Sequence, residues 1–142
     1  MPTRSAKADW HGTLQDGGGH LHMSIGDYSY SSRARFDDAE HQSTNPEELI
    51  AAAQAACYNM ALSVRLSLNK IVPEMLETTA KVSLTPSGIG FKISRIAISV
   101  KAKIPSITEA EFKEHAQIAK ENCPVSSALV AVPISLETAL VD

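Results

Sequence analysis

The sequence predicts an α+β protein in which antiparallel strands surround one buried helix. Three observations predict this class. Stretches near both ends of the chain alternate between polar and apolar residues, a long Ala-rich segment begins with helix-capping signals, and an amphipathic helix precedes a closing strand. Because no segment repeats and no linker composition interrupts these elements, we expect one domain over residues 1–142.

The first third of the chain is predicted to form strands. Residues 7–14 and 21–25 have strand composition and are separated by three consecutive glycines that favour a turn. Residues 28–36 alternate, which places Arg33 and Arg35 on one face of a strand and the neighbouring aromatic residues on the other.

The strongest local signal marks a central helix. Asn45 is a capping residue, Pro46 suits the first helical position, and Glu47 and Glu48 lie beside the positive end of the helix dipole. Glu48 also lies where a capping box places its acid. The helix should run to about Asn69, and because it is apolar on most sides we expect it to be buried.

The second half of the chain adds two strands and two helices. Residues 76–85 and 91–104 alternate, and the parity of the apolar positions changes between Ile93 and Ile96, which indicates a bulge or a bend. Thr108 begins an amphipathic helix to residue 122, with Glu111 completing a second capping box.

The Cys123-Pro124 step should end that helix and begin a short one through Leu129. Residues 130–136 then form the closing strand. The order of strands, helix, strands, helix and strand favours antiparallel pairing.

Composition excludes several classes of protein. The formal charge of −3 gives no reason to expect nucleic acid or an anionic membrane as partner. Residues 1–11 contain no apolar run, so we expect no secretory signal there. The apolar runs look too short to span a bilayer because Gln54, Asn59 and Arg65 interrupt the longest. We therefore expect a soluble cytoplasmic protein.

The two cysteines admit two interpretations. Cys57 and Cys123 lie 123 − 57 = 66 residues apart, so no CxxC motif or zinc-finger spacing is present. Since the cytoplasm keeps thiols reduced, a structural disulfide is not expected. The residues are either two buried, inert thiols or a catalytic pair that the fold brings together.

Local physics ranks the two thiols. Cys57 lies midway along the apolar helix, where burial raises the pKa of a thiol and the helix dipole gives little help. Cys123 precedes Pro124 at the start of a helix, where a thiolate is favoured. Cys123 is therefore predicted to be the more acidic thiol unless a cation approaches Cys57.

Two arginines are candidates for that cation. Arg33 and Arg35 could equally be part of a solvated strand face, and Glu47 either belongs to the helix start or orients an arginine through a bidentate pair. Ten residues separate Glu47 from Cys57, about 15 Å along a helix, so the two cannot meet on one helix. A shared site would then need a second copy of the chain or a bridge over a long gap.

The other side chains carry weaker signals. His20 and His22 share a strand face and could form a two-ligand metal site, but no third ligand has a matching spacing. The motifs of common hydrolases, dinucleotide-binding dehydrogenases, nucleotide triphosphatases and zinc proteases are absent.

Four motifs together resemble the OsmC/Ohr family. The segment Thr44-Asn45-Pro46-Glu47-Glu48-Leu49-Ile50-Ala51-Ala52-Ala53 leading to Ala55-Ala56-Cys57 resembles the central helix of that family. Cys123-Pro124-Val125-Ser126 resembles the second cysteine motif, and Trp10-His11-Gly12 and Ile134-Ser135-Leu136 fit as well. The resemblance covers nearly the whole chain.

The resemblance implies an intertwined homodimer with two active sites at the subunit interface. It implies a thiol-dependent peroxidase for organic hydroperoxides in which Cys57 attacks the peroxide and Cys123 resolves the sulfenic acid. The activating arginine and its carboxylate partner would be Arg35 and Glu47, as in the OsmC branch, although Arg33 lies two residues away.

The same resemblance implies no bound cofactor or metal. An external dithiol, for example of the lipoyl type, would reduce the disulfide. Two alternatives remain open: a non-catalytic, stress-associated dimer that binds an apolar ligand and has inert cysteines, and a metal-binding module built on His20 and His22.

Overall fold

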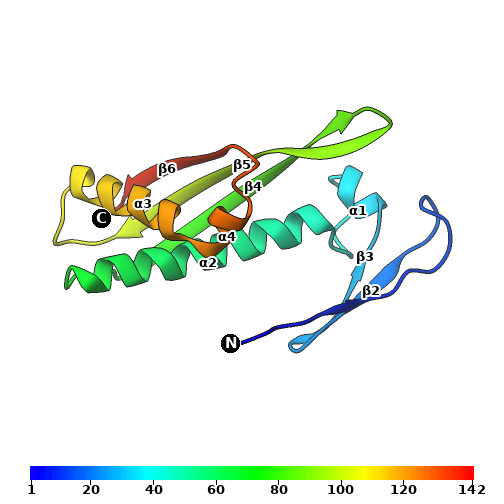
Figure 1. Cartoon of the computed structure of the whole chain (residues 1–142), viewed down its shortest axis with the longest axis horizontal. Helices are drawn as coiled ribbons and strands as arrows, with labels where there is room; N and C mark the ends of the chain where they lie inside the picture. The colour runs from blue at the N-terminus through cyan, green and yellow to red at the C-terminus, as the bar shows by residue number, and fades with distance from the viewer. The chain divides into compact units, whose positions relative to one another are not determined.

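The computed structural model describes all 142 residues as four helices and six strands. The chain forms two compact units, residues 1–49 and residues 50–142, each with a three-stranded sheet (Figure 1). The α+β class predicted from the sequence is therefore confirmed. The assignment of residues 1–142 to one domain stays a prediction.

The first unit contains a small antiparallel sheet. Its strands are β1 (Lys7–Ala8), β2 (Gly19–Met23) and β3 (Gly26–Tyr30). The Tyr30 hydroxyl donates a hydrogen bond of 2.6 Å to the carbonyl oxygen of Asp9. The Tyr30 ring also lies 5.6 Å from that of Trp10, between centroids. The aromatic pair and this hydrogen bond join the end of β3 to the segment that follows β1.

The first predicted strand is much shorter than expected. β1 ends at Ala8, and beyond it only one isolated bridge joins His11 to Gly18. A turn occupies the intervening residues, because Thr13 accepts the N–H of Gly17 on its carbonyl oxygen (2.8 Å) and that of Asp16 on its hydroxyl (3.1 Å). These local bonds compete with strand pairing.

The strand predicted over residues 28–36 is wrong beyond Tyr30. Residues Arg33–Phe36 form the short helix α1 instead. The Ser31 hydroxyl accepts the N–H of Ala34 (3.1 Å), and the Ser32 carbonyl accepts that of Arg35 (3.1 Å), so a serine pair starts a helical turn. Arg33 and Arg35 therefore do not share a strand face, since residues two apart on a helix point in different directions.

The central helix matches its prediction closely. α2 spans Pro46–Leu68. The side-chain oxygen of Asn45 accepts the backbone N–H of Glu48 at 2.9 Å, as a helix cap does. The Asn45 amide nitrogen donates to the carbonyl oxygen of Ala34 at 2.9 Å, which ties the helix start to α1.

The second unit is built on a larger sheet. Its strands are β4 (Met75–Ser87), β5 (Gly90–Lys103) and β6 (Ile134–Leu140). Along β4 and β5, Ser83 lies opposite Arg95 while Leu84 lies opposite Ile93, which leaves Ser94 as an extra residue. The bulge predicted from the parity change is confirmed.

The closing strand corrects the predicted antiparallel pairing. β6 begins at Ile134 instead of Val130 and pairs in parallel with β5. Two helices, α3 (Glu109–Asn122) and α4 (Pro124–Ala128), lie between β5 and β6, and a connection of that length permits parallel pairing. The Thr108–Glu111 capping box of α3 and the short helix after Cys123 are confirmed.

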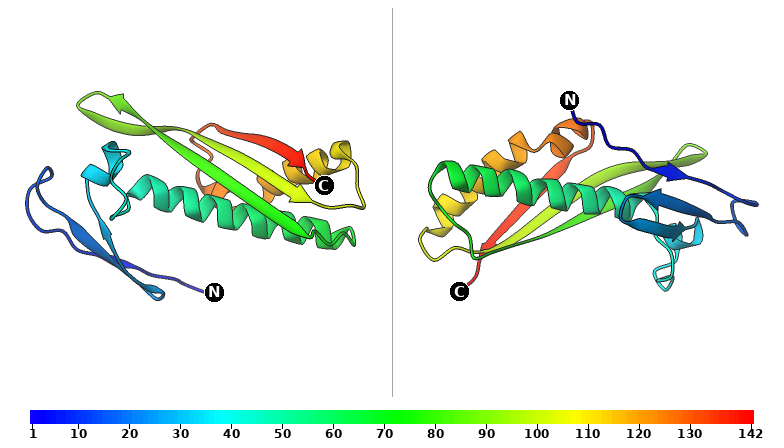
Figure 2. Two further views of the ribbon diagram at one scale, coloured as in Figure 1. Left: turned by 180° about the vertical axis from the view of Figure 1, so that it is seen from behind. Right: turned by 90° about the horizontal axis from the view of Figure 1, so that it is seen from below.

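Both long helices pack on one face of the second sheet, as Figure 2 shows. α2 contributes every fourth residue to the core and β5 every second one, as expected for their periods. The buried residues of these two elements are Gln54, Tyr58, Leu62 and Leu66 from α2, and Ile96, Ile98, Val100 and Ala102 from β5. The Tyr58 hydroxyl donates to the carbonyl oxygen of Ala116 on α3 at 2.9 Å.

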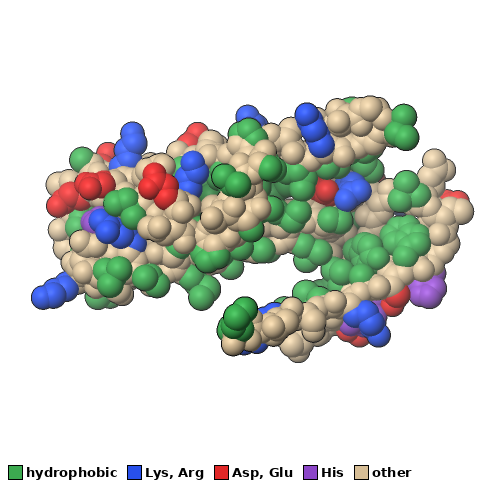
Figure 3. Space-filling view, viewed as in Figure 1, with side chains coloured by type: hydrophobic (Ala, Val, Ile, Leu, Met, Phe, Trp, Pro, Cys, Tyr) green, Lys and Arg blue, Asp and Glu red, His purple; other side chains and the backbone are tan.

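The remaining sides of α2 are open to solvent in the single chain. Met60, Val64 and Leu68 are 71%, 61% and 77% exposed, and hydrophobic side chains gather along this helix in Figure 3. The predicted all-round burial of α2 is therefore not seen within one chain. A stripe of large apolar residues on one helix face is a surface that a partner can cover.

By length and composition alone, α2 could cross a membrane. Its 23 residues include a window of mean hydropathy 1.2, so the sequence-based statement that the apolar runs are too short is wrong by this measure. One such helix is weak evidence, because core helices of soluble proteins meet the same criterion.

Candidate active site

The structure brings the two cysteines together across 66 residues of sequence. Cys57 lies in the middle of α2, and Cys123 is the residue between α3 and α4. Both are free thiols, and a hydrogen bond joins their side chains. Neighbouring thiols on separate elements can be linked by oxidation.

The electrostatics of the pair follow the ranking predicted from the sequence. Burial is the main effect on Cys57 and raises its pKa. The backbone hydrogen bond with Val125 opposes this effect in part, and the hydrogen bond with Cys123 adds a smaller increase. Burial also raises the pKa of Cys123, but hydrogen bonds with the hydroxyl and backbone of Ser126, with Cys57 and with Val125 outweigh it and lower the pKa below its usual value.

Gln54, whose role sequence reasoning missed, completes this thiol site. It is fully buried, and its amide nitrogen donates to the Ser126 hydroxyl at 2.8 Å and to the Cys123 sulfur at 3.7 Å. A lone amide among alanines, three residues before a cysteine on a helix, was the available signal.

Cys57 opens into an apolar pocket of about 360 Å³ between α2 and the α3–α4 segment. Its apolar lining includes Met60, Ala61, Val64, Leu68, Ile118, Ala119 and Pro124. Arg65 and Asn122 supply the polar edge, and Arg65 is held by a 3.0 Å hydrogen bond from its Nε to His115. The pocket suits an organic molecule with an alkyl part better than a small polar one.

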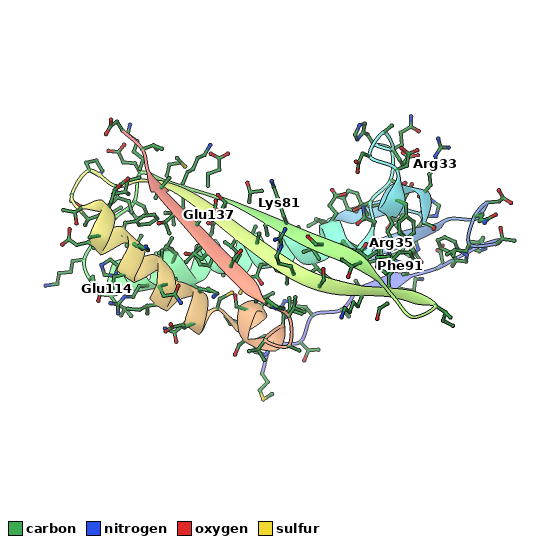
Figure 4. All side chains as sticks on the ribbon, turned by 90° about the horizontal axis from the view of Figure 1, so that it is seen from above. Arg33, Arg35, Lys81, Phe91, Glu114 and Glu137 are labelled. Carbon is green, nitrogen blue, oxygen red and sulfur yellow. The ribbon has the colours of Figure 1, made fainter.

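The predicted arginine site lies in the first unit. Arg35 Nε donates to Glu47 Oε2 at 3.0 Å, and the two side chains are 32% and 12% exposed. Arg33 instead pairs with Asp37 at 3.4 Å and is 72% exposed; Figure 4 labels both arginines. Glu47 thus contacts Arg35 through one nitrogen, Nε, and does not form the bidentate pair that was one of the two sequence-based alternatives. Arg33 pairs with a different acid.

The two histidines of β2, His20 and His22, lie beside carboxylates. The two ring nitrogens of His22 lie 2.9 Å from Asp9 and 3.0 Å from Asp27, and hydrogen bonds to these two acids raise the pKa of His22. His20 is 3.9 Å from the same Asp9 carboxylate. No group of three or more His, Cys, Asp or Glu side chains has a geometry that could hold a metal ion.

An α+β fold with two contacting thiols beside an apolar pocket defines a candidate thiol redox protein. Residues 38–138 match the family of OsmC-like proteins. The chain belongs to this family.

Individual relatives are similar over most of their length. Peroxiredoxin OsmC of Escherichia coli (strain K12) is 38% identical over 131 residues, which cover 90% of each chain. Organic hydroperoxide resistance protein-like 1 of Staphylococcus saprophyticus is 34% identical over 107 residues, 74% of each chain. The crystal structure of the organic hydroperoxide resistance protein OhrB of Bacillus subtilis matches with a TM-score of 0.75 at 29% identity, covering 94% of this chain and 97% of that one. These names support a redox function related to peroxides.

Proposed function

We propose that the protein is a thiol-dependent peroxidase that reduces organic hydroperoxides, and hydrogen peroxide less well, to alcohol or water. The observation that carries this proposal is the contact between the Cys57 and Cys123 thiols. Peroxide chemistry in the names of the relatives supports the same reaction.

The reaction proceeds in three balanced steps. The Cys57 thiolate attacks one peroxide oxygen, the O–O bond breaks, and the alkoxide takes a proton to leave as alcohol while Cys57 becomes a sulfenic acid. Cys123 condenses with the sulfenic acid, forming a disulfide and releasing water. An external dithiol, such as one of the lipoyl type, reduces this disulfide by exchange and is itself oxidised. No bound cofactor takes part.

Cys57 needs a cation, because burial raises its pKa and keeps the thiol protonated. Arg35, oriented by Glu47, would supply it and would also stabilise charge on the departing oxygen. The rise along α2 from Glu47 to Cys57 is about 15 Å, so the arginine that serves Cys57 comes from a second copy of the chain.

An intertwined homodimer would meet this need. The exposed stripe Met60, Val64 and Leu68 on α2 gives the second copy an apolar surface to cover, and covering it would bury α2 on more sides. In this arrangement, each active site lies at the subunit interface. We place the dimer in the cytoplasm, with no nucleic acid or membrane as partner.

Thiol titration after peroxide addition tests the proposal. One equivalent of cumene hydroperoxide added to the reduced protein should remove both free thiols rapidly and form the Cys57–Cys123 disulfide, which peptide mapping would identify. A protein whose buried cysteines only line a ligand pocket would keep both thiols, and that outcome would overturn the proposal.

Two cysteine variants separate the roles in this reaction. Cys57→Ser should abolish catalytic peroxide consumption with dithiothreitol as reductant. Cys123→Ser should consume about one equivalent and then stall or over-oxidise at Cys57. Turnover by Cys57→Ser at the wild-type rate, or full steady-state activity of Cys123→Ser, would contradict the assignment of that cysteine.

A further inference from the structure

Gln54 is placed to act on the sulfur of Cys123. It lies on α2 three residues before Cys57, so both side chains are on the same side of the helix. Its amide nitrogen donates to the Cys123 sulfur and to the Ser126 hydroxyl, while its side-chain oxygen has no hydrogen-bond partner although it is buried. Leaving a buried amide oxygen unsatisfied is costly, which suggests a role beyond packing.

The donors around the two sulfurs are unequal. The Cys123 sulfur forms hydrogen bonds with the hydroxyl and the backbone of Ser126 and with the backbone of Val125. It also accepts the Gln54 amide. Of these groups, only the Val125 backbone also acts on Cys57. A thiolate is stabilised by such donors, so negative charge is held better on Cys123 than on Cys57.

The two sulfurs also differ in accessibility, and here Cys57 is the more accessible one. Cys123 has no exposed surface, whereas Cys57 is partly exposed and lines the pocket between α2 and the α3–α4 segment. An attacking thiolate must reach the sulfur opposite the bond that breaks, so exchange depends on access as well as on the leaving group.

We infer that reductant opens the Cys57–Cys123 disulfide at Cys57, and that Gln54 and Ser126 hold Cys123 as the departing thiolate. The inference rests on the proposed function. The reductant thiolate forms a bond to Cys57 Sγ, the bond between the two protein sulfurs breaks, and its electron pair stays on Cys123. The second thiol of the reductant, as its thiolate, then attacks the reductant sulfur bound to Cys57, releasing the Cys57 thiolate and a cyclic disulfide. Gln54 is a catalytic residue here because it contacts a reacting atom.

Trapping with a monothiol tests which sulfur is attacked. The disulfide of the full-length protein is first formed with diamide, so this test does not depend on peroxide. Brief treatment with glutathione, acid quenching and peptide mass spectrometry should find glutathione on Cys57 and a free thiol at Cys123. An adduct mainly on Cys123, or equal amounts on both, would overturn the inference while leaving the peroxidase proposal intact.

Substitution of Gln54 tests the donor. Gln54→Glu keeps the shape of the side chain but places a carboxylate beside the leaving sulfur, and Gln54→Leu removes the donor. Both should slow reduction of the disulfide by dithiothreitol by about tenfold or more, the value of one hydrogen bond to a charged group. Asn59→Leu, at a partly buried amide of α2 that accepts a hydrogen bond from Thr78, is the matched control and should reduce at the wild-type rate.

Thiolate titration gives a readout that a packing role would not move. In the Cys57→Ser background, ultraviolet absorbance should show Cys123 ionising at lower pH with Gln54 than with Leu or Glu at that position. If the titration and the reduction rate are unchanged in both variants, Gln54 does not hold the thiolate. Failure of the wild-type protein to form the disulfide with an organic peroxide would instead count against the proposed function.

Discussion

Arg33 and Arg35 lie two residues apart and differ in what holds them. Arg35 donates to Glu47 at 3.0 Å, and the Glu47 side chain is mostly buried. Arg33 is largely exposed and pairs with Asp37 within the same turn. Exposed pairs of that kind contribute little, whereas a buried carboxylate fixes the direction of a guanidinium. This difference favours Arg35 over Arg33 for the proposed activation of Cys57.

Substituting these two arginines would test that choice. Arg35→Lys should lower kcat/KM for an organic hydroperoxide by about tenfold to a hundredfold, because an ammonium group cannot reproduce the forked guanidinium donor beside Glu47. Steady-state peroxide consumption measures the effect. Arg33→Lys is the matched control and should stay near the wild-type value; equal losses in both variants would contradict the assignment.

Among the elements, the three-strand sheet of the first unit depends on a close approach at the start of β2. Gly19 is buried, and a Cβ there would collide with the carbonyl oxygen of Asp9 and lie 2.7 Å from the Tyr30 ring. The same Tyr30 donates its hydroxyl hydrogen to Asp9 and packs against Trp10. Only glycine leaves room for these contacts.

Gly19→Ala should therefore destabilise the first unit by about 1–3 kcal/mol, the usual cost of overpacking. Trp10 is the single tryptophan and belongs to this unit, so its fluorescence during urea unfolding reports the change. Gly90→Ala is the control, because a Cβ at Gly90 meets no atom within 4 Å. Unfolding of both variants at the same urea concentration would contradict this role for Gly19.

At the scale of the whole molecule, the apolar face of α2 that also lines the Cys57 pocket is largely exposed in the single chain. Met60, Val64 and Leu68 follow one another at four-residue spacing, so they form one continuous stripe. The opposite stripe of α2 already packs in the core. A second copy that covers the exposed stripe would also supply the arginine proposed for Cys57.

In the proposed homodimer, Val64→Glu should shift the protein from dimer to monomer and reduce peroxidase activity, since the proposed active site needs both copies and Val64 also lines its pocket. Light scattering after size-exclusion chromatography would measure the assembly. Thr79→Glu, which adds the same charge at an exposed position of β4, should leave the dimer and its activity unchanged. Activity that persists in a monomeric Val64→Glu variant would remove the requirement for a second chain.

The amino-acid sequence by itself determined the features that depend on neighbouring residues. The cap at Asn45, the capping box at Thr108, the short helix after Cys123 and the bulge near Ser94 were all predicted and are all present. Each rests on contacts within a few residues or on the period of one strand. The motifs around both cysteines likewise predicted the family to which the chain belongs.

Only the tertiary structure decided which residues and elements that are distant in sequence lie next to one another. Gln54 and Ser126 are 72 residues apart, and their hydrogen bond beside Cys123 has no local signature. The parallel pairing of β6 depends on where two helices carry the chain. The serine turn at Ser31 overrode the alternation that predicted a strand through Phe36. Long-range contacts form because packing satisfies many residues at once, and no single segment encodes that outcome.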